Sequence, residues 1–194
     1  MVTIDRSSDL TTIGANGGGW VAPVGTSSPA DPATQPLPPW APLGAISDDG
    51  LKYGFDEDSQ EFTPWGLTSP FRTIITKSVR TFGMTLWETS RTTVKSVMYR
   101  LDEADLTPTA GVTSYAETAS PSPDRRAWWF VVMDGETLNG FYVPQGEISD
   151  RSDVTFKRDE MSGYEITITA YPDEAGNTVY HLDKLPDTPV YTGS

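Results

Sequence analysis

Few side chains in this sequence could perform catalysis. The chain contains one histidine, His181, and no cysteine, which excludes disulfide bonds, thiolate metal sites and a cysteine nucleophile. His181 lies in a short β-like run at residues 179–182, and no other side chain is spaced as its catalytic partner. The sequence also lacks a nucleophile elbow, a phosphate-binding glycine loop and a zinc-protease motif. We therefore expect no catalytic residue, no cofactor and no enzymatic activity.

One group of carboxylates could bind a cation. Asp56, Glu57, Asp58 and Glu61 form an acidic patch within residues 53–70. The calcium-binding loop requires glycine at its sixth position, and Glu61 occupies that position if Asp56 is the first ligand. We therefore expect no metal site in this patch.

The overall charge limits the partners of the protein. The formal net charge is −13, whereas tight nucleic-acid binding depends on lysine and arginine side chains that neutralise phosphates. Acidic chains are also simply soluble, so the charge alone favours no single function. No apolar run approaches the roughly 20 residues that span a bilayer, and we expect no membrane partner.

A strand followed by a helix is the most regular part of the sequence. From Thr81 onward the residues alternate, with Phe82, Met84 and Leu86 on one face, as in a half-buried strand. After Glu88 the period changes to that of a helix. The apolar residues at the helical spacing i, i+3, i+4 and i+7 are Val94, Val97, Met98 and Leu101. This pattern predicts a helix at about residues 90–101, capped by Thr89 or Ser90, that packs on a sheet.

Residues 1–42 have the composition of an extended N-terminal arm. The run Gly17–Gly19 is followed by prolines at six positions between 29 and 42, and proline cannot donate a backbone hydrogen bond within a sheet. A disordered linker is the alternative. However, several apolar side chains would be costly to leave in water, so we expect a partner subunit to order the arm. These side chains are Trp20, Val21, Leu37, Trp40 and Leu43.

The rest of the chain is predicted to be mainly β. Residues 43–184 form the predicted domain, residues 53–70 a long loop or an extended hairpin, and residues 185–194 a C-terminal tail. Turns are expected at Asp134-Gly135 and Asn139-Gly140. The other expected strands are 45–51, 127–133, 141–143, 154–157, 164–171 and 179–182. The sum predicts a β-sandwich or partly open barrel with one flanking α-helix.

The order of these segments resembles the major tail tube protein of long-tailed bacteriophages. The resemblance lies in Gly19–Thr26, the proline-rich run Leu37–Leu51, the acidic segment that ends near Trp65-Gly66, and Leu86–Thr89 before the helix. It extends over about residues 19–182 and is specific mainly within residues 19–101. The family is also similar in fold to the type VI secretion tube protein.

The resemblance implies a structural virion protein. Six copies would form a ring, and stacked rings would form a hollow tail tube that delivers the genome. The implied partners are further copies of the chain and the tape-measure, tail-tip and tail-terminator proteins, while DNA passes without tight binding. The implied location is the virion tail, after assembly in the host cytoplasm.

The resemblance also implies roles for particular segments. The arm at residues 17–43 and the segment 53–70 would make contacts between subunits and between rings. The strand at residues 72–87, with Phe82, Met84 and Leu86, would help to form the inner barrel. The residues expected in the ring-stacking segment are Phe55, Asp56, Glu57, Asp58, Glu61, Phe62 and Trp65.

Two other functions stay open at the level of sequence. A β-sandwich that binds carbohydrate could use Trp128, Trp129 or Trp65 as a stacking platform, although core packing is the more ordinary role of Trp128 and Trp129. A tail-terminator or head–tail connector protein would form rings that do not stack.

Overall fold

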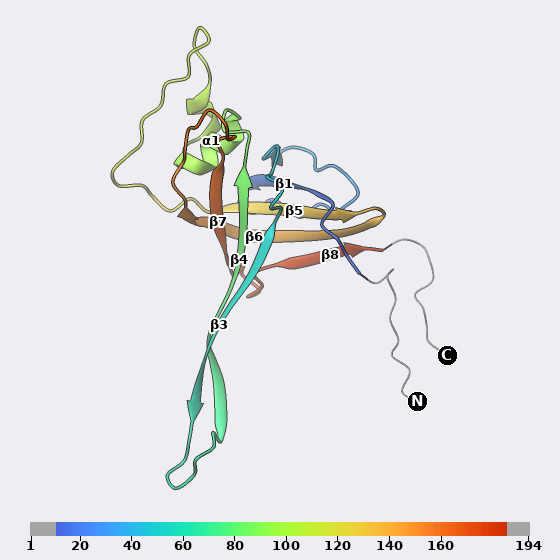
Figure 1. Ribbon diagram of the computed structural model, residues 1–194, viewed down its shortest axis with the longest axis vertical. Helices are drawn as coiled ribbons and strands as arrows, with labels where there is room; N and C mark the ends of the chain where they lie inside the picture. The colour runs from blue at the N-terminus through green and yellow to red at the C-terminus, as the bar shows by residue number, and fades with distance from the viewer. Residues whose placement is uncertain (1–10, 186–194) are drawn as a thin grey trace.

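The computed structural model describes residues 11–185 of the 194-residue chain (Figure 1). Within these residues the chain is mainly β with one α-helix, as predicted. Its strands form one antiparallel sheet that is not closed into a barrel. The predicted tail at residues 185–194 lies outside the described residues except for Leu185. The elements are β1 (Asn16–Pro23), β2 (Ala41–Pro42), β3 (Lys52–Phe62), β4 (Arg72–Leu86), α1 (Thr92–Tyr99), the 3₁₀-helix η2 (Glu103–Leu106), β5 (Arg126–Asp134), β6 (Thr137–Arg151), β7 (Tyr164–Tyr171) and β8 (Tyr180–Lys184).

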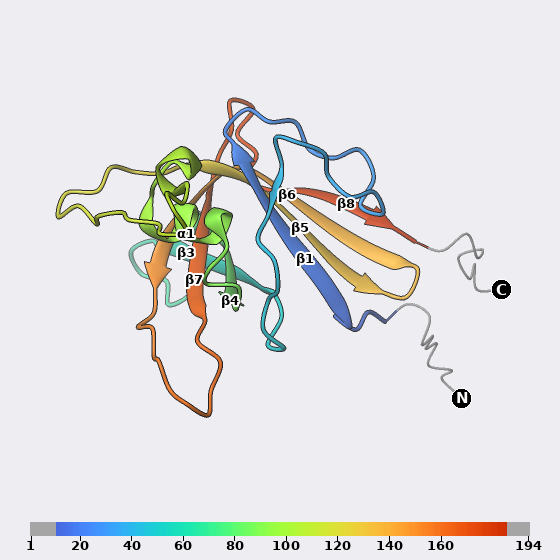
Figure 2. The same cartoon turned by 90° about the horizontal axis from the view of Figure 1, so that it is seen from above.

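All eight strands belong to one sheet in the order β2-β1-β5-β6-β7-β4-β3, with β8 also paired to β6. The long strand β6 joins two parts of this sheet, because its first residues pair with β8 and its last residues pair with β7. Figures 1 and 2 show β1, β5, β6 and β8 running across the molecule, while β4 and β7 cross them. The sheet is therefore bent around its own core, but it does not close into a barrel.

The main core lies on the inner face of the bent sheet. Phe82 from β4 stacks on Phe130 from β5 with ring centroids 5.1 Å apart, and Trp128 also stacks on Phe130 with centroids 6.3 Å apart. The Trp128 indole N–H donates a 3.0 Å hydrogen bond to the Gly146 carbonyl, so this large ring is buried without an unpaired donor. The aromatic stack thus joins both parts of the sheet.

Several predicted patterns are confirmed. Strand β7 buries Tyr164, Ile166, Ile168 and Ala170, as its alternation predicted, and β5 is buried on both faces. A turn connects β5 to β6 close to the predicted position, with Gly135 and Glu136 rather than Asp134 and Gly135 as its two turn residues.

Other predicted elements are wrong. Residues 45–51 contribute only an isolated bridge at Ile46, and residues 154–157 form no strand. The predicted turn at Asn139-Gly140 lies inside β6. Gly140 is required there for packing, because a Cβ atom would lie 2.5 Å from the ring of Trp129.

Helix α1 is shorter than predicted and begins differently. Its N-cap is Arg91, with no side-chain cap, rather than Thr89 or Ser90. The helix ends at Tyr99, and Arg100 follows in the left-handed conformation with φ of 57°. Val94 and Val97 are buried in the main core, whereas Met98 and Leu101 are half-buried and Leu101 lies beyond the helix.

Arginines from the sheet satisfy the carbonyls at the end of α1. Arg151 of β6 donates a 2.9 Å hydrogen bond to the Met98 carbonyl, and Arg126 of β5 donates a 3.2 Å bond to the Leu101 carbonyl. Met98 is among the last four residues of the helix, whose carbonyls have no backbone donor within it, and cations near a helix C-terminus are stabilising. The two arginines therefore fix α1 on the sheet.

Candidate assembly surfaces

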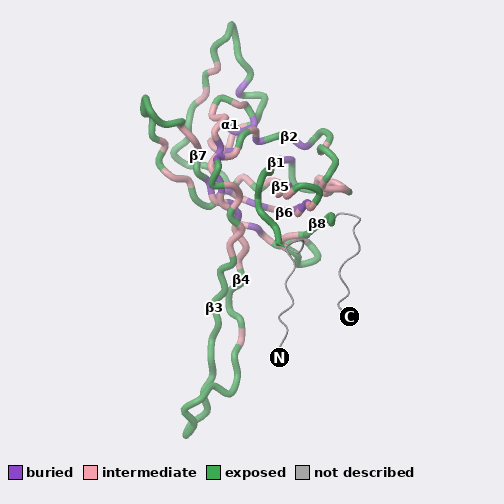
Figure 3. The backbone as a smooth tube through the Cα atoms, turned by 45° about the vertical axis from the view of Figure 1, so that its right-hand side comes forward, coloured by how far each residue is buried: buried purple, intermediate pink, exposed green. Residues whose placement is uncertain are grey.

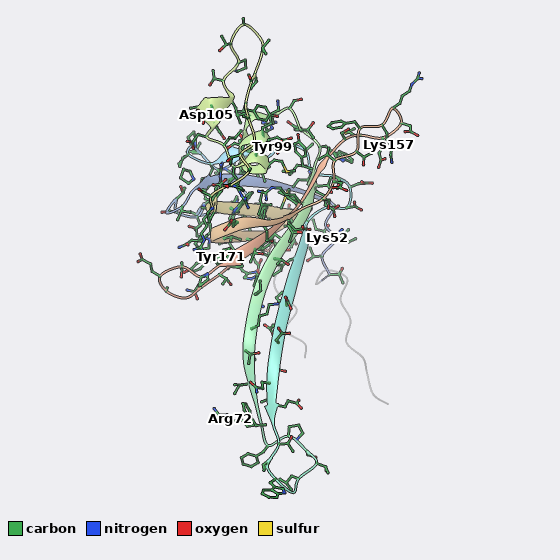
Figure 4. The ribbon with its side chains drawn as sticks, turned by 90° about the vertical axis from the view of Figure 1, so that its left-hand side faces the viewer. Lys52, Arg72, Tyr99, Asp105, Lys157 and Tyr171 are labelled. Carbon is green, nitrogen blue, oxygen red and sulfur yellow. The ribbon has the colours of Figure 1, made fainter. Side chains whose placement is uncertain are left out.

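The β3–β4 hairpin projects far from the body of the protein (Figure 3). The segment predicted as a long loop or extended hairpin is an extended hairpin, in which β3 pairs with β4 from Lys52 to Phe62. Figure 4 shows Lys52 near the body and Arg72 close to the far end. A register shift between Asp58 and Ser59 marks a bulge in the outer part, and bulges increase the local bend and twist of a hairpin.

Asp56, Glu57 and Asp58 of β3 form ion pairs across the hairpin. The guanidinium of Arg80 lies 2.8 Å from a carboxylate oxygen of Glu57 and 4.8 Å from the ring centroid of Phe55. Hydrogen bonds from Arg80 and Ser78 lower the pKa of Glu57. Lys77 pairs with Asp56, and this contact raises the pKa of Lys77.

The tip of the hairpin is apolar and exposed. Between Phe62 and Phe71 the sequence carries no charged residue. Large apolar side chains at this end are exposed, and Trp65 is fully so. We define the hairpin tip as residues 62–71. The exposed apolar side chains at or beside it are Phe62, Trp65, Leu67, Phe71 and Ile75.

Strand β3 also forms a free edge of the sheet. It pairs with β4 alone among the strands of residues 11–185, and it ends the strand order. A long unpaired edge is a template for pairing with another chain. The structure therefore has an exposed edge that leads directly to an exposed apolar tip.

The apolar residues of the predicted arm mostly pack on their own chain. Val21 and Leu43 are buried in the main core, and Trp40 is buried in a second cluster on the outer face of the sheet, against which Trp20 packs. These placements differ from the expectation that a partner subunit orders the arm. The physical reason is that β1 pairs with both β5 and β2, so the segment is part of the sheet. Leu37 is the exception, with 78% of its surface exposed.

The segment between β1 and β2 forms a pocket on the outer face. This pocket has a volume of about 460 Å³ and is lined by residues 26–31 and 34–40. We call it the proline pocket, because Pro29, Pro36, Pro38 and Pro39 are among its walls. The sequence pattern does not predict this pocket, and its one local signal is the density of prolines before Trp40.

Three contacts hold the proline pocket in place. The Tyr142 hydroxyl donates a 2.7 Å hydrogen bond to the Thr26 carbonyl, and Lys184 forms a 2.9 Å ion pair with Asp31. The Trp40 ring packs edge-on against Tyr142 with centroids 6.2 Å apart. The pocket is thus fixed on β6 and β8 rather than being a loose loop.

The predicted inner-barrel residues point into the core of the subunit. Phe82, Met84 and Leu86 are buried in the main cluster. The alternate positions Thr81 and Thr85 lie on the opposite face of β4 and are half-buried. If β4 contributes to a channel, the side chains that face it come from this opposite set.

The remaining chemical candidates take part in surface packing. The His181 ring lies 5.2 Å from Phe141 and 5.9 Å from Tyr53, measured between ring centroids. Within residues 11–185 no group of three or more His, Asp or Glu side chains could hold a metal ion. No helix in this part of the chain is long and apolar enough to cross a membrane.

The comparisons with known proteins identify the family. A search of curated proteins found no match to the chain. A scan against protein-family models matched residues 5–191 to the family described as phage tail tube protein. This match extends over nearly the whole chain, including the hairpin and the proline pocket. The chain therefore belongs to the phage tail tube protein family.

Proposed function

We propose that the chain forms hexameric rings that stack into the tail tube and that the tube delivers the genome. Family membership makes it a structural tail protein, and this role requires copies of one chain to bind each other. The observation that carries the finer proposal is the β3–β4 hairpin, which presents a free strand edge and an exposed apolar tip.

The hairpin is costly for an isolated subunit. Exposed apolar area costs roughly 25 cal/mol per Å² in water, and large exposed apolar patches mark interaction sites. A neighbouring copy removes this cost by covering the tip and by pairing with the edge of β3. In a closed ring each copy offers the same edges, so every copy is satisfied in the same way.

The charge of the subunit suits a conduit for DNA. Each copy carries a formal charge of −13, so a tube of many copies repels phosphates rather than binding them. The proposed partners are further copies of the chain and the tape-measure, tail-tip and tail-terminator proteins. The virion tail is the location that the family implies, and assembly in the host cytoplasm belongs to this proposal.

Electron microscopy of the purified protein tests the proposal. The expected result is hollow tubes of stacked rings with six-fold symmetry in averaged end views. Rings that never stack would favour a terminator or connector role instead. A strict monomer at every concentration and ionic strength would contradict the proposal.

The carbohydrate-binding alternative has lost most of its support. Trp128 and Trp129 are both buried, so neither can offer a flat ring to a sugar. Trp65 is exposed, but it lies at the tip of a projecting hairpin rather than in a pocket. A glycan-binding screen with the wild-type protein and Trp65→Ala checks this alternative directly, and saturable binding that the substitution abolishes would restore it.

A further inference from the structure

The hairpin tip and the proline pocket are complementary surfaces. The tip, residues 62–71, is uncharged and bears exposed aromatic and aliphatic side chains. The pocket is lined mainly by proline, small residues, Leu37 and Trp40. Aromatic side chains pack well against proline-rich segments, because a proline-rich segment has little conformational freedom to lose on binding.

The charges of the two surfaces also match. Two copies of a subunit with a net charge of −13 repel each other, so they bind most readily where each copy carries little charge. The single charged residue that lines the pocket is Asp31, and the 2.9 Å ion pair with Lys184 compensates it. Contact between tip and pocket therefore adds no like-charge repulsion.

The positions of the two surfaces favour a head-to-tail contact. In Figures 1 and 3 the hairpin points away from the body along the long axis, while the segment between β1 and β2 lies on the side of the sheet away from the tip. A contact between different surfaces of two identical molecules leaves one surface of each kind free on the resulting dimer. Further copies can therefore add at both ends. Such a contact extends along an axis.

We propose that the hairpin tip of one copy docks in the proline pocket of a second copy, with Trp65 as the central side chain. This inference rests on the proposed function and adds the pair of surfaces that joins successive copies. Three contacts already hold the pocket in place within the subunit, as described above. The pocket residues therefore lose little conformational entropy when the tip binds.

Cysteine cross-linking tests the docking directly, because the natural chain has no cysteine. Leu67→Cys marks the tip and Leu37→Cys marks the pocket, and both side chains are exposed. Tubes of the double variant, once oxidised, are expected to give a ladder of covalent oligomers on a non-reducing denaturing gel. The matched control pairs Leu67→Cys with Met161→Cys, an exposed site outside the pocket, and it is expected to give no ladder.

The outcomes separate this inference from the proposed function. Tubes that form without a ladder in the Leu67→Cys, Leu37→Cys protein would overturn the docking and leave tube formation intact. Dimers of the Leu67→Cys single variant would show that tips meet tips, which also overturns it. If the parent protein forms neither rings nor tubes, the proposed function fails and the docking fails with it.

A second measurement does not depend on introduced cysteines. Trp65→Ala removes the central side chain of the docking, and truncation of such a residue costs roughly 30-fold in affinity. The concentration at which tubes appear is expected to rise by roughly this factor. Phe156→Ala is the control, since Phe156 is an exposed aromatic residue on another loop. Equal assembly by both variants would overturn the inference.

Discussion

Arg126 of β5 donates a 2.9 Å hydrogen bond to the hydroxyl of Ser96 in α1. The Ser96 hydroxyl in turn donates a 2.6 Å bond to the Leu101 carbonyl, and Ser96 is completely buried. A buried series of hydrogen bonds such as this one is stabilising only when every polar group in it has a hydrogen-bond partner. The link between these two residues therefore determines how the only α-helix of residues 11–185 sits on the sheet.

Replacing Arg126 is expected to destabilise the fold. Arg126→Met keeps much of the side-chain length but removes the donor to the Ser96 hydroxyl, one of the two donors to the Leu101 carbonyl and the ion-pair partner of Asp124. The expected cost is about 2–4 kcal/mol. Urea denaturation measures the change. Arg125→Met is the matched control, because Arg125 makes a cation–π contact with Tyr171 at 4.2 Å, which is worth only about 0.5–1 kcal/mol at an exposed site. Equal losses in both variants would contradict this account of α1.

A methyl group at Gly146 is expected to disturb the aromatic stack. A Cβ atom there would lie 2.6 Å from the Trp128 ring and 3.0 Å from Ile168, so Gly146→Ala should cost about 1–3 kcal/mol through overpacking. Gly83→Ala is the control, because its nearest neighbour would be 3.7 Å away. The melting temperatures of both variants check the expectation, and a Gly146→Ala protein as stable as Gly83→Ala would contradict it.

Two leucines of the same segment are expected to separate folding from assembly. Leu43 is completely buried, so Leu43→Ala should destabilise the subunit by about 2–5 kcal/mol. Leu37 is exposed in the proline pocket, so Leu37→Ala should leave stability within about 0.5 kcal/mol and weaken tube formation. Denaturation curves and electron microscopy of both variants give the answer. Normal tubes from Leu37→Ala would count against a role for the pocket.

Tyr99 is expected to make stability fall at high pH. Its hydrogen bond with Tyr164, together with burial, raises the pKa of Tyr99 to about 12, whereas an unfolded tyrosine ionises at about 10. The stabilisation is therefore fully present below pH of about 10 and is lost as the pH rises to about 12. Tyr99→Phe should remove this part of the loss. Denaturation of both proteins across that pH range measures it, and identical pH dependence would show that Tyr99 does not contribute.

The sequence predicted those elements whose burial follows a regular pattern. Apolar residues alternate in β7 and at the end of β4, and one face of each of these segments is buried. The uniformly apolar β5 is buried on both faces. The valines of α1 lie at helical spacing and are buried. In each case the local order of residues reflects the environment directly.

Long-range pairing was not visible in the same way. Residues 16–23 pair with residues 126–133, more than a hundred positions later in the chain. The local order of residues in either segment does not predict which strand the other one pairs with. The dipeptide Asn139-Gly140 predicted a turn. Gly140 instead lies in a strand, where a larger residue would collide with the ring of Trp129. The proline pocket was also missed, because it depends on Tyr142 and Lys184 from distant strands.

The order in which the chain is synthesised has a consequence for the timing of polymerisation. Strands β3 and β4 are neighbours in sequence, so the hairpin can form soon after both have left the ribosome. The proline pocket also needs Tyr142 of β6 and Lys184 of β8, which are translated much later. Under the proposed docking, a nascent chain would have its hairpin tip well before its proline pocket, and neighbouring chains on one polysome would not join through these surfaces until translation is nearly complete.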